Sequence, residues 1–190
     1  MEIGDLSARA RRIRLLSCDV DGVLTDGRLY YADDGRELKA FSSLDGLGIK
    51  MLERCGITVA WITGSRSPAV LRRADDLGVR HVALNSEEKL SVRERLREEL
   101  SLESEQCAHI GDDLPDLPLL MRSGLAVAVP HAPESIKRRV HYVTRASGGD
   151  GAVRELAELI LAAQGSLEAM LRAYDPPETA DGRGTANRQA

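Results

Sequence analysis

One segment, Ile13-Arg-Leu-Leu-Ser-Cys-Asp-Val-Asp-Gly-Val23, places two closely spaced carboxylates directly after a short apolar run. The run at 13–18 predicts a β-strand, and the nearly continuous apolar run at 57–62 predicts a second. Strands that are apolar on both sides are typical of a parallel sheet whose two faces are covered. Four further strands are predicted at 80–84, 107–111, 125–129 and 141–144.

Amphipathic helical patterns separate these strands. Ser67 and Pro68 form a start signal and Gly78 a stop signal for one helix, and apolar residues recur at helical spacing within 44–55 and 152–164. Strands that alternate with helices predict an α/β fold, a doubly wound, mostly parallel, Rossmann-like sheet with helices on both faces. Ligands of such sheets bind at the carboxyl ends of the strands.

Three segments fall outside this alternation. Residues 28–41 predict a β-hairpin flap, because Asp34-Gly35 suits a tight turn between two strand-like runs. Residues 1–12 are expected to form a helical lead-in, and residues 13–174 a single domain. Residues 175–190 are expected to be a disordered tail, since their Pro, Gly and polar side chains offer little apolar surface to bury.

Length and composition exclude several classes of protein. The 190 residues suit one domain, and 26 basic against 30 acidic residues give a net charge of −4, which is not the basic footprint of a nucleic-acid partner. No apolar run approaches the roughly 18 residues that span a bilayer, and the N-terminus lacks a signal-peptide pattern, so no membrane partner is expected. Three cysteines without Cys-x-x-Cys spacing indicate free thiols and a cytoplasmic location.

The carboxylates of Asp19 and Asp21 stand two positions apart, which in extended chain sends both to the same side. Like charges held close repel, so the pair needs a cation or a shared proton. Mg²⁺ suits the position, because it is commonly held by one or two carboxylates plus a substrate phosphate. A solvated acidic turn is the alternative. An EF-hand is excluded, since Val23 and Tyr30 stand where that loop needs oxygen ligands.

Three other predicted strands are followed by polar residues of the kinds that occur in phosphate-binding and phosphoryl-transfer sites. Thr63-Gly64 offers a hydroxyl and close backbone approach, and Lys89, in a helix opened by Ser86, offers a point charge. Taken singly, these also fit an ordinary turn and a solvated helix lysine. Asp112, Asp113 and Asp116 follow the strand at 107–111, where helix capping by Asp113 explains one carboxylate but not three. In a doubly wound sheet all of these ends converge on one pocket.

This order of groups resembles the haloacid dehalogenase superfamily of phosphohydrolases, whose four motifs match Asp19-Val-Asp-Gly-Val, Thr63, Lys89 and Gly-Asp-Asp-Leu-Pro-Asp116. The resemblance implies that Asp19 is the nucleophile, forming an aspartyl-phosphate, and that Asp21 is the general acid and base. It implies that Mg²⁺ is held by Asp19, the main-chain oxygen at Asp21 and Asp112. Thr63 and Lys89 would bind the transferring oxygens, while Asp113 and Asp116 would support the metal waters or Lys89.

Longer segments, such as Cys18–Gly27 and Gly124–Val129, resemble the capless subgroup of 3-deoxy-D-manno-octulosonate 8-phosphate phosphatases. The intervals between motifs leave no room for a cap domain, so to exclude water either the substrate is large or another subunit covers the site, and the hairpin is a candidate flap or interface arm. The resemblance implies a homotetramer acting on a small phosphorylated sugar acid in lipopolysaccharide biosynthesis. It also implies substrate contacts from Ser42, Ser43, Asp45, Gly46, Lys50, Gly64, Arg66, Arg73 and Lys89.

Ser42, Ser65 and the segment 83–86 depart from the subgroup's usual residues, and these departures affect substrate contacts more than phosphoryl chemistry. Three alternatives therefore stay open. One is a phosphatase of a related nonulosonate 9-phosphate. Another is a non-catalytic module of a sugar-nucleotide pathway, and a third is a signalling receiver domain, whose acidic residues occur in a different order along the chain.

Overall fold

The computed structural model describes residues 3–175 and contains one six-stranded sheet in which every neighbouring pair is parallel. The strands follow the spatial order β5-β4-β1-β6-β7-β8, and the predicted α/β fold is confirmed. Their bounds are β1 Leu15–Cys18, β4 Thr58–Ile62, β5 His81–Ala83, β6 Cys107–Gly111, β7 Leu125–Ala128 and β8 Tyr142–Val143.

The strand order places a topological switch point between β1 and β6. From β1 the chain builds outward through β4 and β5, then returns to β6 on the other side of β1 and builds outward again. Cys18, the last residue of β1, pairs with Trp61 of β4 and Ile110 of β6. The carboxyl ends of these three strands therefore form one crevice, where doubly wound sheets bind their ligands.

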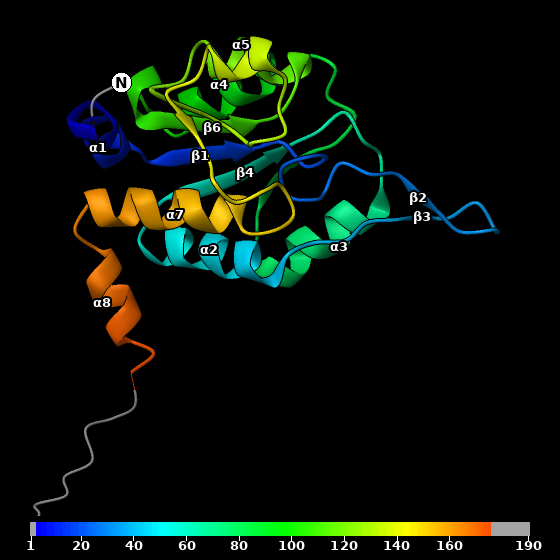
Figure 1. Cartoon of the computed structure of the whole chain (residues 1–190), viewed down its shortest axis with the longest axis horizontal. Helices are drawn as coiled ribbons and strands as arrows, with labels where there is room; N and C mark the ends of the chain where they lie inside the picture. Colours follow the sequence, from blue (N-terminus) through cyan, green and yellow to red (C-terminus); the bar gives the residue numbers. More distant parts are fainter. Residues whose placement is uncertain (1–2, 176–190) are drawn as a thin grey trace, which may run out of the picture.

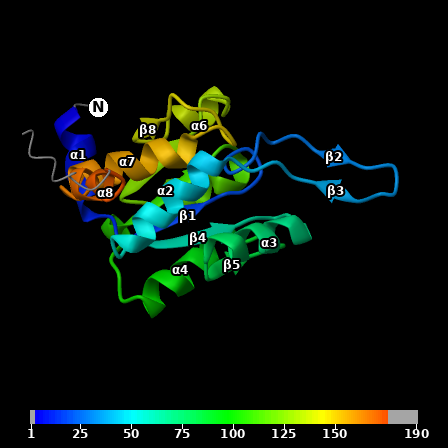
Figure 2. The same ribbon diagram turned by 90° about the horizontal axis from the view of Figure 1, so that it is seen from below.

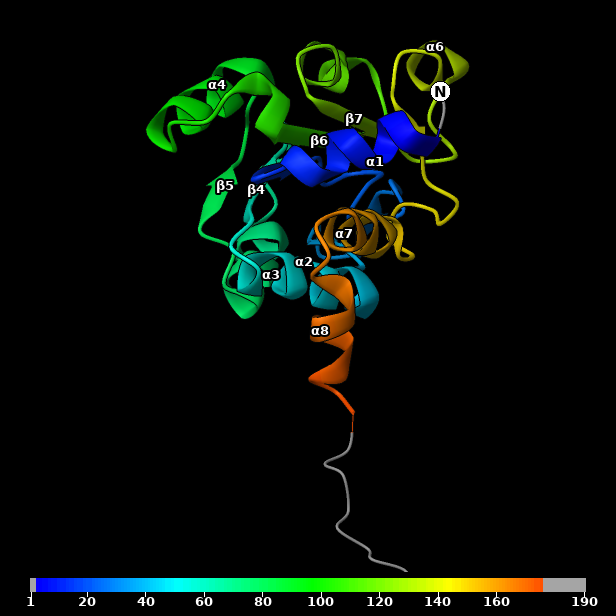
Figure 3. The same cartoon turned by 90° about the vertical axis from the view of Figure 1, so that its left-hand side faces the viewer.

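Helices cover both faces of the sheet, with α2, α3 and α7 on one side and α4 and α5 on the other (Figures 1 and 3). α2 and α7 pack side by side, and α1 packs against α7. The helical elements are α1 Ile3–Arg12, α2 Ser43–Arg54, α3 Pro68–Leu77, α4 Lys89–Glu99, α5 Leu117–Leu120, α6 Glu134–Lys137, α7 Ala152–Ala163, α8 Leu167–Arg172, and the 3-10 turns η1 Ser104–Gln106 and η2 Leu114–Asp116.

The boundaries of α3 follow the local signals, whereas the start of α4 does not. α3 begins with Pro68 after Ser67 and ends at Gly78, whose φ of 82° is the left-handed conformation that glycine adopts readily. α4 begins at Lys89 behind Glu88, so the expectation that Ser86 opens this helix is wrong. The Ser86 hydroxyl instead donates to the carbonyl of Leu84 and stabilises the loop before the helix.

The predicted hairpin is present and projects away from the sheet as an arm (Figures 1 and 2). Its strands, β2 (Tyr30–Tyr31) and β3 (Glu37–Leu38), pair antiparallel. The connection closes through Gly35, whose φ is 81° and whose N–H donates to the carbonyl of Ala32. The arm returns the chain to α2, so it begins and ends at the crevice.

The core is built almost wholly from aliphatic side chains on β1, β4, β6, β7, α2 and α7. Trp61 is the largest fully buried side chain, and Phe41 at the end of the arm stacks on it with ring centroids 6.2 Å apart. Within residues 3–175, none of the helices combines the length and the apolar character needed to cross a lipid bilayer. Apart from Asp175, the predicted tail at 175–190 lies outside the described residues.

Candidate active site

The loop that follows β1 places Asp19 at the centre of the crevice. The Asp19 N–H donates to the carbonyl of Ile110, and the N–H groups of Leu24 and Thr25 both donate to the carbonyl of Val20. Gly22 has a φ of 94°, and a Cβ there would lie 2.2 Å from Oδ2 of Asp112. Only glycine therefore lets the loop after β1 approach the loop after β6 this closely.

Lys89, the first residue of α4, joins these two loops through ion pairs. Its Nζ lies 2.7 Å from Oδ1 of Asp19 and 2.7 Å from Oδ1 of Asp116, and all three side chains are buried. Burial disfavours the ammonium, but the two carboxylates raise the pKa of Lys89 above its usual value. Lys89 is therefore a fixed cation beside the Asp19 carboxylate.

The three carboxylates after β6 occupy different environments. Asp116 is 1% exposed, accepts a hydrogen bond from the Asp112 N–H on Oδ2, and has its pKa held at about 2 against burial by His109 and Lys89. Asp113 is exposed and caps η2 through the Leu114 N–H, the role that helix capping predicts. Asp112 is half-buried beside Gly22.

The charge distribution of the cluster fits a hard divalent cation. Oxygens of Asp19, Asp112 and Asp116 lie within 4.8 Å of one another. Burial and the Asp116 charge raise the pKa of Asp19 to about 8, although Lys89 opposes the rise, and burial and neighbouring carboxylates raise that of Asp112 to about 6. These raised pKa values indicate that the cluster holds more negative charge than Lys89 neutralises. Carboxylate oxygens are also the ligands that Mg²⁺ prefers.

An open cavity of about 430 Å³ lies over this cluster. Thr63, buried at the end of β4, accepts from the Ser65 N–H through Oγ1, so its own hydroxyl proton is free to donate into the cavity. The structure thus brings together the four predicted catalytic residues, of which Lys89 is also a predicted substrate residue, and Gly64, a second predicted substrate residue. The residues lining the cavity are Asp19, Asp21, Thr63, Gly64, Ser65, Ser86, Glu87, Lys89 and Pro115.

Four of the predicted substrate residues gather instead at the amino end of α2. Ser42 caps the helix by accepting from the N–H of Leu44, and Ser43 is its first residue. Arg73 of α3 donates to the Ser42 carbonyl at 3.3 Å. It crosses α2 over Gly46, where a Cβ would come within 2.5 Å of the guanidinium.

Asp45 is placed differently from the expectation that it contacts substrate. Its side chain is buried, and its oxygens accept from the N–H groups of Gly151 and Arg154 at 3.3 and 2.9 Å. This carboxylate thus holds the amino end of α7 against α2, where the helix dipole also favours a negative charge. The structure therefore corrects the expected role of Asp45 to helix packing.

Two further predicted substrate residues stand outside the cavity lining. Arg66 is exposed, and its Nε donates to Oδ1 of Asn85 at 2.6 Å, which ties the loop after β4 to the loop after β5. Lys50 lies in the second half of α2. Within residues 3–175 it forms no hydrogen bond or ion pair with the strand-end residues.

Lys39 of the arm is a site residue that the motif analysis missed. Its side chain is only 2% exposed, and its Nζ pairs with the Asp21 carboxylate and, at 2.8 Å, with Glu37. Burial opposes the charge, but hydrogen bonds to Asp21 and Glu37 raise the pKa of Lys39. Glu37 and Lys39 stand two positions apart in a strand-like run, so their side chains are expected on the same side of it. This spacing was the sequence signal that could have identified Lys39.

Gly148, Gly149 and His131 were also missed, because they come from later loops. The Gly149 N–H donates to the carbonyl of Val23, and a Cβ on Gly148 would lie 1.8 Å from the Gly22 carbonyl oxygen. His131 Nε2 lies 4.0 Å from Oδ2 of Asp112. The paired glycines thus pack against the loop after β1.

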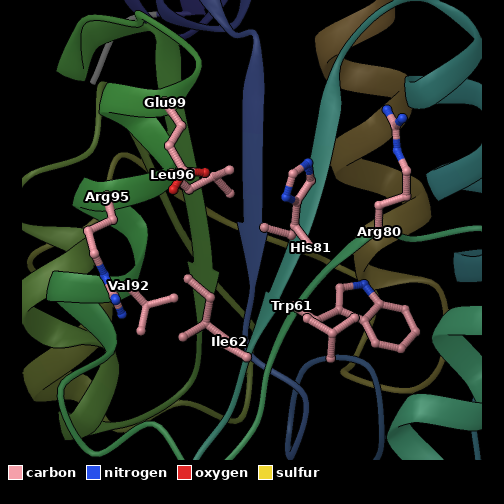
Figure 4. Close-up of a pocket in the computed structure, with 11 residues that line it drawn as sticks. Trp61, Ile62, Arg80, His81, Val92, Arg95, Leu96 and Glu99 are labelled. Atoms are coloured by element: carbon pink, nitrogen blue, oxygen red, sulfur yellow. The ribbon is translucent and has the colours of Figure 1, made fainter.

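A second cavity, of about 280 Å³, lies between α4 and the strands β4 and β5 (Figure 4). Figure 4 shows Val92 and Leu96 of α4 pointing toward these strands, with the Glu99 carboxylate next to Leu96. No residue predicted to act in catalysis or binding lines it. The strand-end cavity is therefore the candidate active site.

The sequence and the fold both match known phosphatases. A family model described as haloacid dehalogenase-like hydrolase matches residues 81–156. The 3-deoxy-D-manno-octulosonate 8-phosphate phosphatase KdsC of Yersinia pestis is 48% identical over 164 residues, covering 86% of this chain and 88% of the relative. A probable YrbI family phosphatase from Pseudomonas syringae is 51% identical, with a TM-score of 0.88 over 90% of this chain and 97% of that one.

A third match was solved with ligands. The 3-deoxy-D-manno-octulosonate 8-phosphate phosphatase of Moraxella catarrhalis, in complex with magnesium, phosphate and KDO, is 40% identical, with a TM-score of 0.89 over 92% of this chain and all of that chain. These similarities extend far beyond the four motifs. The chain belongs to the 3-deoxy-D-manno-octulosonate 8-phosphate phosphatase family of haloacid dehalogenase-like hydrolases.

Proposed function

We propose that this chain is a Mg²⁺-dependent phosphatase that hydrolyses 3-deoxy-D-manno-octulosonate 8-phosphate to the free sugar acid and phosphate, in the cytoplasm, for lipopolysaccharide biosynthesis. The observation that carries the proposal is the convergence of Asp19, Asp21, Thr63 and Lys89 on one cavity at the switch point of the sheet. The matching relatives from Yersinia pestis and Moraxella catarrhalis are named for this activity. Residues 13–174 act as its single domain.

In the first step, an Asp19 carboxylate oxygen attacks phosphorus and the bond from phosphorus to the sugar oxygen breaks. Asp21 donates its proton to that leaving oxygen. Thr63 and Lys89 bind the transferring oxygens, and Lys89 is already held beside Asp19 at 2.7 Å. In the second step, Asp21 takes a proton from water, the water oxygen attacks phosphorus, and the bond to Asp19 breaks.

Asp19, the main-chain oxygen at Asp21 and Asp112 would hold the metal ion. When bound, Mg²⁺ supplies positive charge that offsets the phosphoryl oxygens and the surplus carboxylates. Asp116 is left to position Lys89, because Oδ1 and Oδ2 already accept hydrogen bonds from Lys89 and the Asp112 N–H. Asp113 supports the loop by capping η2.

Lys39 positions Asp21 from the arm, through the ion pair at the base of the hairpin. The residues that face the substrate come from α2, α3 and the loop after β4. They are Ser42, Ser43, Gly46 and Arg73 at the amino end of α2, together with Lys50, Gly64 and Arg66. A sugar acid phosphate carries several negative charges, so basic side chains suit its recognition.

A homotetramer completes the active site in this proposal. The arm exposes the apolar side chains of Leu29, Tyr31 and Leu38, which are 62%, 68% and 54% exposed, with Tyr30 39% exposed. Exposed apolar surface of this kind marks an interaction site. Neighbouring arms would cover it and exclude water from the cavity, a task that a cap domain performs in larger enzymes.

The test is phosphate release from 3-deoxy-D-manno-octulosonate 8-phosphate with and without Mg²⁺, with a nonulosonate 9-phosphate as the competing substrate. We expect Mg²⁺-dependent turnover of the eight-carbon acid and a loss of at least about 1000-fold in Asp19→Asn, the scale of removing a catalytic nucleophile. Unchanged activity in Asp19→Asn would overturn the assignment of Asp19 as the nucleophile. Preference for the nine-carbon acid would overturn the proposed substrate, and no turnover of either compound would favour a non-catalytic module.

A further inference from the structure

A buried chain of hydrogen bonds runs beneath the active site from β1 to β6 and then to Lys89. The Ser17 hydroxyl lies 2.9 Å from Nδ1 of His109, and His109 Nε2 lies 3.2 Å from Oδ1 of Asp116. Asp116 Oδ1 in turn accepts from Lys89 at 2.7 Å. Ser17, His109 and Asp116 are 0%, 0% and 1% exposed, so solvent cannot replace these contacts.

The partners determine which ring nitrogen carries the proton. The Asp116 carboxylate only accepts hydrogen bonds, so His109 Nε2 must be the donor. Nδ1 is then free to accept from the Ser17 hydroxyl at 2.9 Å. This hydroxyl shares its single proton between Nδ1 and the Ala108 carbonyl, to which it also donates, at 3.1 Å. Burial lowers the pKa of His109 despite Asp116, which agrees with a neutral ring beside the Lys89 cation.

Asp116 depends on this ring for its orientation. Its Oδ2 accepts from the Asp112 N–H at 3.1 Å, and its Oδ1 is shared between Lys89 and His109. Without His109, Lys89 would be the sole side-chain donor to Oδ1, while also pairing with Asp19. The carboxylate could then rotate, and Lys89 and the Asp112 loop would both lose their common anchor.

We propose that His109, with Nε2 as donor to Asp116, and Ser17, which orients the ring through Nδ1, are positioning residues for Lys89. This inference rests on the proposed phosphatase function, because Lys89 is there the group that binds the transferring oxygens. The position of Lys89 relative to Asp19 determines how well charge in the transition state is stabilised. His109 and Ser17 therefore affect turnover without touching the substrate.

The first test reads the ring directly in the wild-type chain, labelled with ¹⁵N at histidine. Long-range ¹H–¹⁵N correlation spectra are expected to show a proton on Nε2 of His109, assigned by its absence in His109→Gln. A ring without a proton on Nε2 would overturn the proposal. Because this measurement needs no substrate, it is independent of the proposed function, which fails separately if the wild type does not release phosphate.

The second test compares two replacements of one ring. His109→Leu removes the donor and is expected to lower kcat by about 10-fold to 100-fold, the range for a lost supporting contact, with KM within about 3-fold of the wild type. His109→Gln can place its amide N–H near the position of Nε2 and is expected to recover kcat to within about 5-fold. Ser17→Ala is expected to give a smaller loss than His109→Leu.

His141, the residue directly before β8, provides the control. His141 Nδ1 accepts from the Ala126 N–H at 2.8 Å, away from the strand-end carboxylates, so His141→Leu should lower the melting temperature and leave kcat unchanged. A folded His109→Leu with wild-type kcat, or a His109→Gln as impaired as His109→Leu, would overturn the proposal. If His109→Leu does not fold, the kcat of His109→Gln and the protonation of Nε2 in the wild-type spectrum still test the proposal.

Discussion

The role of an aspartate in this protein depends on the donors that surround it. Asp19 and Asp116 both pair with Lys89, yet burial raises the pKa of Asp19 to about 8 while His109 and Lys89 hold that of Asp116 at about 2. Asp45 is equally buried but caps a helix. Side chains of one type in one fold therefore divide into a candidate nucleophile, a positioning residue and a structural cap.

At the same scale, Lys39 is expected to position Asp21. Lys39→Gln removes the positive charge that holds the Asp21 carboxylate, so we expect kcat to fall by about 10-fold to 100-fold, the scale of a misplaced catalytic group. Steady-state phosphate release measures the effect. Lys137→Gln, which breaks the remote Glu134 ion pair at 2.7 Å, is the control and should retain wild-type kcat. Equal rates for both variants would contradict the role of Lys39.

At the scale of elements, loops from opposite ends of the chain support each other. The loop after β1 is held by the loop before α7, where the Gly149 N–H donates to the carbonyl of Val23. The arm begins from one of these loops and ends at α2, and α2 is held to α7 by Asp45. The catalytic loop is therefore positioned from two sides, directly by the loop before α7, which is more than a hundred residues away in sequence, and through the arm by α2, which Asp45 joins to α7.

Gly148→Ala tests this contact between loops. The new Cβ would lie 1.8 Å from the Gly22 carbonyl oxygen, so the loop carrying Asp21 must shift. We expect a lower melting temperature and a fall in kcat of about 10-fold or more, because a displacement of about 1 Å is costly at a reacting centre. In Gly4→Ala of α1 the new Cβ meets no atom within 4 Å, so this variant should not lower the melting temperature and should leave kcat unchanged. Wild-type kcat in Gly148→Ala would show that the two loops move independently.

For the whole molecule, the carboxylate cluster links stability to metal and pH. Above about pH 4 the metal-free folded protein keeps protons, on Asp112 up to about pH 6 and on Asp19 up to about pH 8, that the unfolded chain, with pKa values near 3.8, has released. Stability of the metal-free protein should therefore fall as pH rises through this window. Asp116, whose pKa is lowered, contributes stability that is lost only below about pH 4.

Thermal melting with EDTA or Mg²⁺ checks this linkage. Because the cation takes the place of the retained protons, we expect Mg²⁺ to raise the melting temperature more at about pH 8 than at about pH 6. Asp112→Asn, which removes one of the carboxylates, should reduce the difference. An equal or larger effect of Mg²⁺ at the lower pH would contradict the assignment of the cation to these carboxylates.

The exposed apolar surface of the arm predicts a role in assembly. Replacing Tyr31 and Leu38 together by Asp places charge on its apolar surface and should convert the proposed tetramer to smaller species. Light scattering coupled to size exclusion measures the change. Met121→Asp, an equally exposed apolar position at the end of α5, should leave the assembly intact. If the arm variant is still a tetramer, the arm does not form the interface between subunits.

Much of the fold could be predicted because it depends on local patterns. Each of the six parallel strands falls at a predicted apolar run, and α3 ends at the predicted glycine. The start of α4 could not be predicted from Ser86, because the loop uses that hydroxyl for its own carbonyl. Lys39 and His109 were not identified as site residues, since their partners lie 18 and 7 residues away and on other elements.

By itself, the sequence determined the order of strands and helices and the placement of Asp19, Thr63, Lys89 and Asp112 at strand ends, because apolar periodicity and caps act over a few residues. The tertiary structure alone decided which of these groups meet. Ion pairs form only when folding brings α4 and the loop after β6 to the end of β1. Both carboxylates are buried there, and the donors His109 and Lys89 around Asp116, rather than residue type, separate its pKa from that of Asp19.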